Sequence, residues 1–579
     1  MNTKTILRYA AAAATALAAL ACSKDDATNP EPGNPDTPGT SAPYTITATM
    51  ADAPETRISA TDDGSSKIEL KWKSGDKIYV VNSSEKGSSS AETLYTFTFA
   101  SSSSDGKTAS FTAPDGYSGT PAYAVHRGNF PFSYFDPASI DSYTSNYLSS
   151  ISALPDNYSL WACYDAETRQ LKFKPFNAVL KLNITLPEGA AGTLSNMRIG
   201  SADGSEIFYA DYYDITSGEA VRTSSTMSDR INLTGYGSFT GNTEKSVYLS
   251  VSPGTELSGQ TLEIDLLVGS SVCTATIKGG RLEAGKCYPL TLGTAKWTAR
   301  KIYEGGTGAQ NDPYRITTET NLRALARAVK IRETYKGKYF LLTGDISGVQ
   351  TSEAEPWLPI GAGGSSYFGG NFDGGNHTVG GTFQFSDKDG TSLGLFGYCS
   401  GSSSISNLTL AGDVAYSGTR TATVSLGGIA GDCEGTITGC THTGALTATN
   451  AQASMIYAGG IAGYYSGTII TGCTQQNGNI RVNAGSSTRV GGIVGYMYKS
   501  SSVMHTCHNS ASSIEATGQY TVNAGALVGS NNGTVYSCST FTGLTITEKG
   551  TQQNPVRAIG FGYPGQDEPQ TCPNDGHTN

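Results

Sequence analysis

The sequence predicts an all-β protein in which two β-sandwiches are followed by a C-terminal parallel β-helix with a short capping helix. Three observations lead to this fold class. A glycine-rich pentad recurs at a nearly fixed period in the last third of the chain, apolar and polar residues alternate through the middle, and a single segment has helical periodicity. The 579 residues are enough for three folded units and a tethered N-terminal tail.

The first element is a targeting segment over residues 1–21. Lys4 and Arg8 precede an alanine-rich stretch that is too short to span a membrane and is typical of a signal peptide. The segment ends in Leu20-Ala21-Cys22, which resembles a bacterial lipobox. This resemblance implies that Cys22 becomes the mature N-terminus and carries lipid, which would anchor the protein to the outer membrane at the cell surface.

Residues 22–43 are predicted to hold the lipid anchor and a proline-rich linker. Ser23, Lys24, Asp25 and Asp26 resemble the acidic export tag that follows the lipidated cysteine in surface lipoproteins of Bacteroidetes, and a solvated charge pair is the alternative. The prolines that follow favour an extended spacer over a folded element.

The middle of the chain is predicted to form two β-sandwiches, over residues 44–175 and 176–300. Apolar and polar residues alternate in segments such as Ile68-Glu-Leu70-Lys-Trp72, and turn residues separate these segments. No long helical pattern interrupts them, which is typical of all-β sandwich domains.

One helix is predicted within residues 318–331. Four apolar residues follow the i, i+3, i+4, i+7 pattern of one helix face: Leu322, Leu325, Ala326 and Val329. Thr317 or Thr318 can serve as the N-cap. Because a solenoid has an apolar end that a terminal unit must cover, we interpret this helix as the cap, and docking of a partner helix is the alternative.

The repeat region covers residues 301–560, and residues 561–579 form a tail. The pentads are Gly427–Gly431, Gly459–Gly463, Gly491–Gly495 and Gly525–Gly529, with a relative at Leu393–Gly397. Their last glycines are 397, 431, 463, 495 and 529, so the steps are 34, 32, 32 and 34 residues. Each unit holds about three short apolar runs, which predicts three strands per coil of a parallel β-helix. Leucine-rich, ankyrin and tetratricopeptide repeats need a shorter period or two helices per unit.

The repeats resemble a known family. Pentads followed by Gly-Thr-Ile and a cysteine, as in Gly435-Thr-Ile437-Thr-Gly-Cys440, are similar to the GLUG repeats of bacterial surface proteins, including adhesin-like lipoproteins. The resemblance covers residues 301–548 and implies a parallel β-helix at the cell surface.

The two predicted sandwiches resemble the fimbrillin family of Bacteroidetes surface and pilus proteins. The resemblance rests on Glu55-Thr56-Arg57, Trp72–Ile78, Phe176–Leu180 and Leu282–Tyr288. It implies two transthyretin-like sandwiches and, in some members, polymerisation by strand exchange after cleavage behind an arginine. Arg57 is the candidate cleavage position, and an ordinary strand-flanking arginine is the favoured alternative. A long C-terminal solenoid favours a tip, accessory or stand-alone adhesin over a plain shaft subunit.

The charge pattern argues against nucleic acid as a partner, since the net charge is −10 and the repeat block has no basic stripe. The sequence contains no nucleotide-binding glycine loop and no His-Glu-any-any-His motif. Strand alternation would place Cys507 and His508, the core of a metal-like cluster, on opposite faces. We therefore expect no metal and no cofactor. Because the coils hold few carboxylates, we expect no enzymatic activity, and a carbohydrate-active β-helix enzyme is the weakest alternative.

Eleven cysteines in an exported chain would normally suggest disulfides. Four of them recur once per coil, and we interpret these as an inward-facing ladder of small buried residues: Cys440, Cys473, Cys507 and Cys538. Cys399 and Cys433 share another coil position. A bridge among Cys163, Cys273 and Cys287 stays open.

Tyr398, Tyr464 and Tyr496 directly follow the last glycines of their pentads. Stacked coils would align them in a column, with Asp432 at the skipped rung. Aromatic faces with polar edges suit sugar rings or protein surfaces, so these tyrosines are the candidate ligand-binding residues, and packing within the stack is the favoured alternative.

The sequence as a whole predicts a surface-anchored lipoprotein adhesin that binds a glycan or a protein on another cell or on a matrix. A structural or tip subunit of a fimbria, with other fimbrial subunits as partners, is the first alternative. The carbohydrate-active enzyme is the second.

Overall fold

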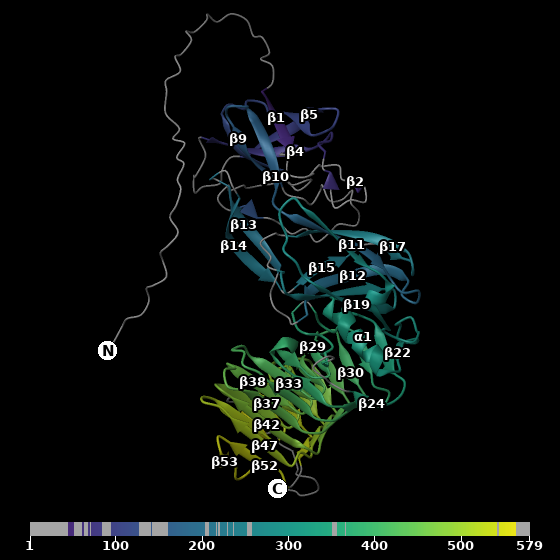
Figure 1. Cartoon of the computed structure of the whole chain (residues 1–579). Coiled ribbons are helices and arrows are strands. Elements are labelled where there is room, and N and C mark those ends of the chain that lie inside the picture. Colours follow the sequence, from purple (N-terminus) through teal and green to yellow (C-terminus); the bar gives the residue numbers. More distant parts are fainter. Residues whose placement is uncertain are drawn as a thin grey trace, which may run out of the picture. The chain divides into compact units, whose positions relative to one another are not determined.

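The computed structural model describes residues 44–50, 61–62, 68–69, 71–83, 94–126, 140–141, 160–202, 208–215, 217, 220–228, 230–234, 237–251, 257–349, 356–364, 366–540 and 543–562. Their regular structure is almost entirely β-strand, and α1 (Glu319–Lys330) is the one α-helix among them. The predicted all-β fold class with a C-terminal parallel solenoid is confirmed (Figure 1). The predicted signal peptide, Cys22, the export residues Ser23, Lys24, Asp25 and Asp26, and the candidate cleavage position Arg57 lie outside the described residues.

The first β unit is a single sheet that is closed into a barrel by hydrogen bonds between its strands. This differs from the predicted sandwich, which has two separate sheets. Its strands follow the order β1 (Thr45–Met50), β10 (Gln170–Pro175), β9 (Leu160–Asp165), β7 (Pro121–His126), β4 (Lys77–Asn82), β5 (Tyr95–Ser102) and β6 (Thr108–Thr112). β1 closes the ring, because it pairs parallel to β10 and antiparallel to β6. Trp72 fills the interior, with its ring 5.0 Å from that of Phe111 and 5.3 Å from that of Phe173.

The second β unit has two sheets around one core, as predicted for a sandwich. One sheet has the order β17 (Glu244–Val251), β11 (Ala178–Thr185) and β20 (Cys287–Leu292). The other runs β15 (Arg230–Thr234), β12 (Gly192–Ser201), β18 (Thr261–Val268), β19 (Ser271–Lys278) and β21 (Thr298–Lys301), and β16 (Ser238–Phe239) pairs with β12. Leu182 and Ile264, one from each sheet, belong to the same buried cluster.

Helix α1 begins and packs as the sequence predicted. Thr318 is the N-cap, and it forms a capping box with Asn321. The four apolar residues of the predicted face are buried in the same cluster as the interior of the first coils, so α1 covers the end of the solenoid. Its charged side turns to the second β unit, where Lys330 Nζ lies 2.9 Å from Glu263 Oε1 of β18. The helix therefore covers the solenoid and also joins it to the sandwich.

The solenoid consists of five sheets, visible as the stacked green to yellow strands of Figure 1. Their strands are parallel except at the end of one sheet, where β52 (Thr545–Glu548) and β53 (Thr551–Gln552) pair antiparallel. One coil contains β33 (Val424–Gly427), β34 (Ala430–Cys433), β35 (Thr436–Thr438), β36 (Thr441–Thr443) and β37 (Leu446–Asn450). Each of these strands pairs in parallel with its counterpart about one period further along the chain. The described coils thus stack as the pentad spacing predicted.

The prediction of three strands per coil is wrong, because two of the three apolar runs contain a corner, which gives five strands per coil. The pentad separates two strands, as Gly428 does between β33 and β34. A second corner follows the next strand, where Gly439 has a φ of 63°. The equivalent residues in other coils also have left-handed backbone: Asn407, Gly472, Thr506 and Ser537. A count of apolar runs misses such corners, since a single residue with positive φ is enough to turn the chain.

The predicted cysteine ladder is confirmed. Cys440, Cys473, Cys507 and Cys538 are buried and are not bridged to one another, and Cys399 pairs with Cys433 in neighbouring coils. No disulfide joins Cys163, Cys273 and Cys287 or any other pair of the described cysteines.

A buried polar ladder, not foreseen from the sequence, lies beside the cysteine ladder. His442, Gln475, Asn509 and Thr540 pair in successive coils, and all four are buried. Three of them contact the second glycine of a pentad, where an added Cβ would collide with the side chain: Gly428 with His442, Gly460 with Gln475, and Gly492 with Asn509. The second glycine is therefore needed for space inside the coil.

Candidate functional site

The predicted tyrosine column exists on the outer face of one solenoid sheet. Tyr398 of β29 (Phe396–Cys399) pairs with Asp432 of β34, and Asp432 pairs with Tyr464 of β39 (Ala462–Tyr465). Tyr464 in turn pairs with Tyr496 of β44 (Val494–Met497). The next residue on three of these strands points inward and is buried, as strand alternation requires: Cys399, Cys433 and Tyr465.

A second column stands beside the first, on the strands that precede the pentads. Tyr457 of β38 (Met455–Gly459) pairs with Arg489 of β43 (Ser487–Gly491). The Tyr457 ring lies 5.7 Å from that of Tyr464 and 5.4 Å from that of Tyr496. The pentad glycines let neighbouring coils pack closely at this corner, since a Cβ on Gly463 would collide with the backbone of Leu426 and Gly431 in the preceding coil.

Tyr498 completes the cluster at the surface. Its ring lies 5.7 Å from those of both Tyr464 and Tyr496, and the residue is 50% exposed. Arg489 stacks its guanidinium on the cluster, with Cζ 3.9 Å from the ring centre of Tyr496. We call Tyr457, Tyr464, Tyr496 and Tyr498 the tyrosine patch. Rings in contact across neighbouring coils contribute to stacking, as expected for packing, but the exposed ring leaves a face open to a ligand.

The polar groups around the tyrosine patch are incompletely paired. Asp432 Oδ1, Arg489 Nε and Asn532 Oδ1 are buried without a hydrogen-bond partner among the described residues. The amide nitrogen of Asn532 donates to the Tyr496 hydroxyl at 3.3 Å and to the Tyr498 carbonyl at 2.8 Å. Tyr398 lies at the edge of the patch and donates its hydroxyl to Glu434 Oε1 at 2.9 Å. Buried polar atoms are normally paired, so these three, which lie on three different coils, are exceptions.

Burial, with a smaller contribution from the nearby Glu434 carboxylate, raises the pKa of Asp432 from 3.8 to about 7. In the folded protein this carboxyl keeps its proton to a higher pH than it does in the unfolded chain. Its contribution to stability therefore falls as the pH rises through this range, because ionisation favours the unfolded state.

A pH experiment tests this environment. Raising the pH from about 5.5 to about 8 is expected to lower the free energy of unfolding by about 2 kcal/mol through Asp432 alone. In the variant Asp432→Asn this contribution disappears, so its stability changes less over the same range. Urea unfolding of both proteins at several pH values measures the difference. Equal pH dependence in the two proteins would contradict the buried, unpaired carboxyl.

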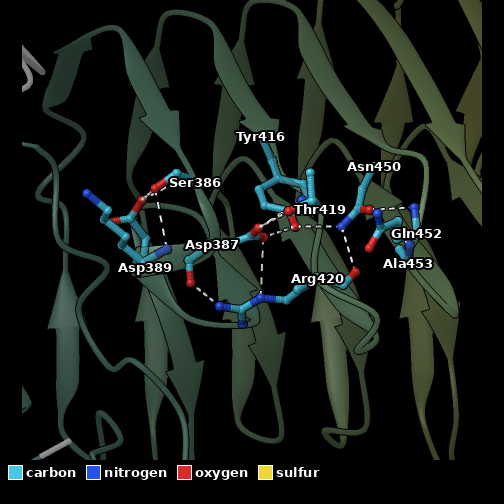
Figure 2. Close-up of polar contacts among 10 residues, drawn as sticks. Ser386, Asp387, Asp389, Tyr416, Thr419, Arg420, Asn450, Gln452 and Ala453 are labelled. Carbon is cyan, nitrogen blue, oxygen red and sulfur yellow. Dashed lines mark hydrogen bonds and ion pairs between the residues drawn. The ribbon is translucent and has the colours of Figure 1, made fainter. Parts of the chain in front are cut away.

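A second polar cluster on the solenoid serves as a contrast (Figure 2). Asp387 accepts hydrogen bonds from the Tyr416 hydroxyl at 2.8 Å and from the Thr419 backbone N–H at 2.8 Å. Arg420 pairs with the same carboxylate, its Nε 3.4 Å from Oδ1. Asn450 donates to the Tyr416 hydroxyl at 2.9 Å and to the Arg420 carbonyl at 3.0 Å.

The Asp387 cluster ties three successive coils together. Burial raises the pKa of Asp387, but the hydrogen bonds of Thr419 and Tyr416 and the charge of Arg420 outweigh it, so that the pKa is lowered. Asp389, two residues away, accepts from the backbone N–H and the hydroxyl of Ser386. Since these carboxylates are engaged within the chain, we assign the cluster a structural role and take the tyrosine patch as the candidate site.

The remaining sequence candidates do not converge on a site. Cys507 belongs to the interior ladder, whereas His505 stacks on Tyr536 and His508 contacts Ser539 Oγ at 2.7 Å. Among the described residues, no group of three or more metal-binding side chains is close enough to hold an ion. In the same part of the chain, no helix has the length and apolar character needed to cross a bilayer.

Sequence reasoning missed four members of the site: Tyr457, Arg489, Tyr498 and Asn532. Tyr457 and Arg489 were detectable, because each lies two residues before the first glycine of a pentad. Because they share this position, stacked coils align Tyr457 and Arg489 in a column. Only the short pentad separates this position from that of Tyr464, so the two columns are expected to lie side by side. No repeat position marks Tyr498 or Asn532.

No protein-family model and no curated protein sequence matches this chain. Among solved structures, a candidate immunoglobulin A1 protease from Bacteroides ovatus is 18% identical, with 45% of this chain and 87% of that chain covered and a TM-score of 0.29. A candidate cell adhesion protein from Bacteroides uniformis is 15% identical, with 44% and 96% covered and a TM-score of 0.28. Another from Bacteroides ovatus is 15% identical, with 45% and 96% covered and a TM-score of 0.29.

Proposed function

We propose that this protein is a surface-displayed adhesin that binds its ligand at the tyrosine patch and acts by binding, not by catalysis. The observation that carries the proposal is the cluster of aromatic rings on the outer face of the solenoid, in which Tyr498 is half exposed. An exposed aromatic ring with a polar edge is suited to contact with a ligand.

The rest of the molecule suits this role. The solenoid has one continuous apolar core that runs from α1 to the last described coil, so the sheets that present the patch are rigidly supported. The lipid anchor at Cys22 and the export residues Ser23 to Asp26 would place the protein on the outside of the cell. Both stay predictions from the sequence.

An adhesion experiment tests the proposal. The full chain is displayed on a non-adherent bacterial host, and attachment to epithelial cells, matrix proteins and other bacteria is counted. Attachment to at least one surface is expected to rise at least tenfold over the host alone and to fall to that background with Tyr498→Ala. The control is Tyr536→Ala, since Tyr536 is similarly exposed, at 43%, but lies on another sheet. Attachment no greater than that of the host would refute the proposal.

A fimbrial subunit is the second candidate, and strand β1 favours it. β1 is held in the barrel on both edges and buries Ile46, Ala48 and Met50, so its removal would open a groove for a donor strand from another subunit. Cleavage behind Arg57 would separate β1 from the rest of the chain. Protease treatment of the full chain that gives high-mass ladders on gels would favour this candidate, and an unchanged monomer would remove it.

A further inference from the structure

The tyrosine patch has opposite charges at its two ends. Glu434 directly follows β34, at the end of the patch that belongs to the earlier coils. At the other end Arg489 stacks on Tyr496, and Lys499 directly follows Tyr498 and is exposed. A ligand with charges of a single sign would therefore be attracted at one end of the patch and repelled at the other.

The two charged ends lie in one column of the solenoid, two coils apart. Three backbone N–H groups donate to the equivalent carbonyl of the preceding coil: those of Glu434, Ser466 and Tyr498. Since neighbouring parallel strands are about 4.8 Å apart, Glu434 and Tyr498 are separated by about 10 Å along the solenoid axis. Ser466, on the coil between them, is small and buried, so it does not keep an approaching surface away from the patch.

The charges at the ends of the patch are not balanced within the chain. Neither Arg489 nor Lys499 forms an ion pair with another residue in the part of the chain that the structure describes. Arg481, by contrast, lies on another sheet and pairs with Glu515 at 3.0 Å. The hydroxyl that donates to Glu434 is neutral, so the charge of this carboxylate is unbalanced as well. The patch is thus complementary to a surface that carries the two charges in the reverse order.

A second copy of this chain is such a surface. Two copies can meet face to face around a two-fold axis that lies between them, at the level of Tyr464 and perpendicular to the solenoid axis. This axis exchanges the coils on either side of Tyr464 and keeps each position along the strands. Glu434 of each copy then lies opposite the partner's Lys499, and the aromatic rings lie between the charges. Tyrosine and arginine are enriched in the centres of protein interfaces.

The same two-fold axis sets the direction of the two solenoids. It reverses the solenoid axis, so the solenoids run antiparallel and their first coils lie at opposite ends of the contact. Because the predicted lipid anchor is N-terminal, this arrangement suits copies on two facing cells better than neighbours on one cell. The patch is small, so a single pair of copies binds weakly, and many copies on each cell are needed for strong attachment.

We infer that the tyrosine patch binds a second copy of this protein on a facing cell, with Glu434 of each copy paired to the partner's Lys499. This inference rests on the proposed function, because it names the ligand of the same surface. The contact requires no other molecule, so cells that display this protein clump with one another.

A clumping experiment with the full chain tests the inference. The protein is displayed on a non-adherent bacterial host in two fluorescent populations, and mixed-colour contacts are counted. Wild-type cells are expected to clump at least about tenfold more than the host alone. Glu434→Lys and Lys499→Glu should each reduce clumping at least about tenfold, because each places like charges opposite one another twice. A mixture of the two variant populations should clump like the wild type, since both opposing pairs then have opposite charges.

The matched control is the exposed pair of Arg481 and Glu515 on another sheet. Arg481→Glu and Glu515→Lys should each leave clumping within about twofold of the wild type. A further variant, Glu434→Gln, keeps an oxygen for the Tyr398 hydroxyl and removes only the charge, so it tests the contact even if Glu434→Lys does not fold. It should reduce clumping about fivefold.

The outcomes separate this inference from the proposed function. Wild-type cells that stay dispersed, or that bind host cells without the protein as readily as each other, overturn the second-copy contact. Tyr498-dependent attachment to another surface would then leave the adhesive function standing. Clumping that survives Glu434→Gln, or a mixture of folded variants that stays dispersed, also overturns the contact. The absence of both clumping and attachment removes the inference together with the proposed function.

Discussion

Replacing Glu263 with alanine is expected to cost about 3 to 5 kcal/mol of stability, because it leaves three cations in a buried site with one carboxylate. Glu263 lies 2.9 Å from Lys330 Nζ, 3.0 Å from Arg327 Nη1 and 3.4 Å from Arg198 Nη1. The Arg198 side chain is only 1% exposed, so water cannot replace the lost partner. Asp265, which lies 3.1 Å from Arg327 Nη1, is then the remaining anion of the cluster.

The pH dependence of this site follows from the same contacts. Burial opposes ionisation of Glu263, but the charges of Lys330 and Arg327 prevail and hold its pKa well below the usual range. A lowered pKa means that the stabilisation is present above the unfolded pKa of 4.5 and is lost as the pH falls through the folded value. Glu263→Ala should therefore differ most from the wild type near neutral pH.

The measurement is urea unfolding combined with hydrogen exchange of the α1 amides. Because α1 joins the solenoid to the sandwich through this cluster, its amides are expected to exchange faster in Glu263→Ala. The control is Glu283→Ala, whose partner Lys286 lies 2.6 Å away in an exposed pair, and which should cost less than about 1 kcal/mol. Removing Lys330 as well should recover part of the loss, since it takes away an uncompensated charge. A cost below about 1 kcal/mol for Glu263→Ala would show that the ion cluster does not hold the joint.

The elements that the sequence could predict depend on local pattern. The pentad period gave the stacking of coils, because parallel coils repeat the same residue at the same height. Thr318 and the apolar spacing after it gave α1, since capping and helix periodicity act within a few residues. The column of Tyr398, Tyr464 and Tyr496 followed from the period alone.

The elements that the sequence could not predict depend on contacts between distant segments. Glu263 and Lys330 are 67 residues apart, and neither belongs to a repeat that would align them. The closure of the first unit into a barrel requires β1 to pair with β10, which lies more than a hundred residues further along the chain. The corner at Gly439 depends on one left-handed residue, and the asparagine, threonine and serine that replace it elsewhere carry no common signal.

The interior of the coils shows the same division. The second glycine of each pentad is visible in the sequence, but the sequence does not show why a glycine is required there. The side chain that fills the space beside it comes from a strand about fifteen residues later in the chain. Gly460 faces Gln475, and Gly492 faces Asn509. In the last described coil the equivalent position is Ala526, and the equivalent of Asn509 is the shorter Thr540. A methyl group at the glycine position thus occurs with a smaller partner.

This correspondence predicts that the substitution Gly460→Ala strongly lowers the stability of the solenoid. The added Cβ would collide with the Gln475 side chain and with the Gly492 carbonyl oxygen of the next coil. Gln475 cannot simply move aside, since its amide nitrogen donates to the Gly444 carbonyl at 3.0 Å and the Asn477 carbonyl at 2.9 Å. Overpacking against backbone in a closed core is expected to cost about 3 kcal/mol.

A double-mutant cycle tests the reason for that cost. Gln475→Thr alone is destabilising, because it removes buried hydrogen bonds. Combined with Gly460→Ala it reproduces the pair found in the last coil, so the double variant should be at least about 1 kcal/mol more stable than the sum of the single effects predicts. Urea unfolding gives all four free energies. The control is Gly344→Ala, where an added Cβ meets no atom within 4 Å, and which should change stability by less than about 0.5 kcal/mol. Strict additivity in the cycle would mean that the glycine is required by the neighbouring backbone and not by the polar ladder.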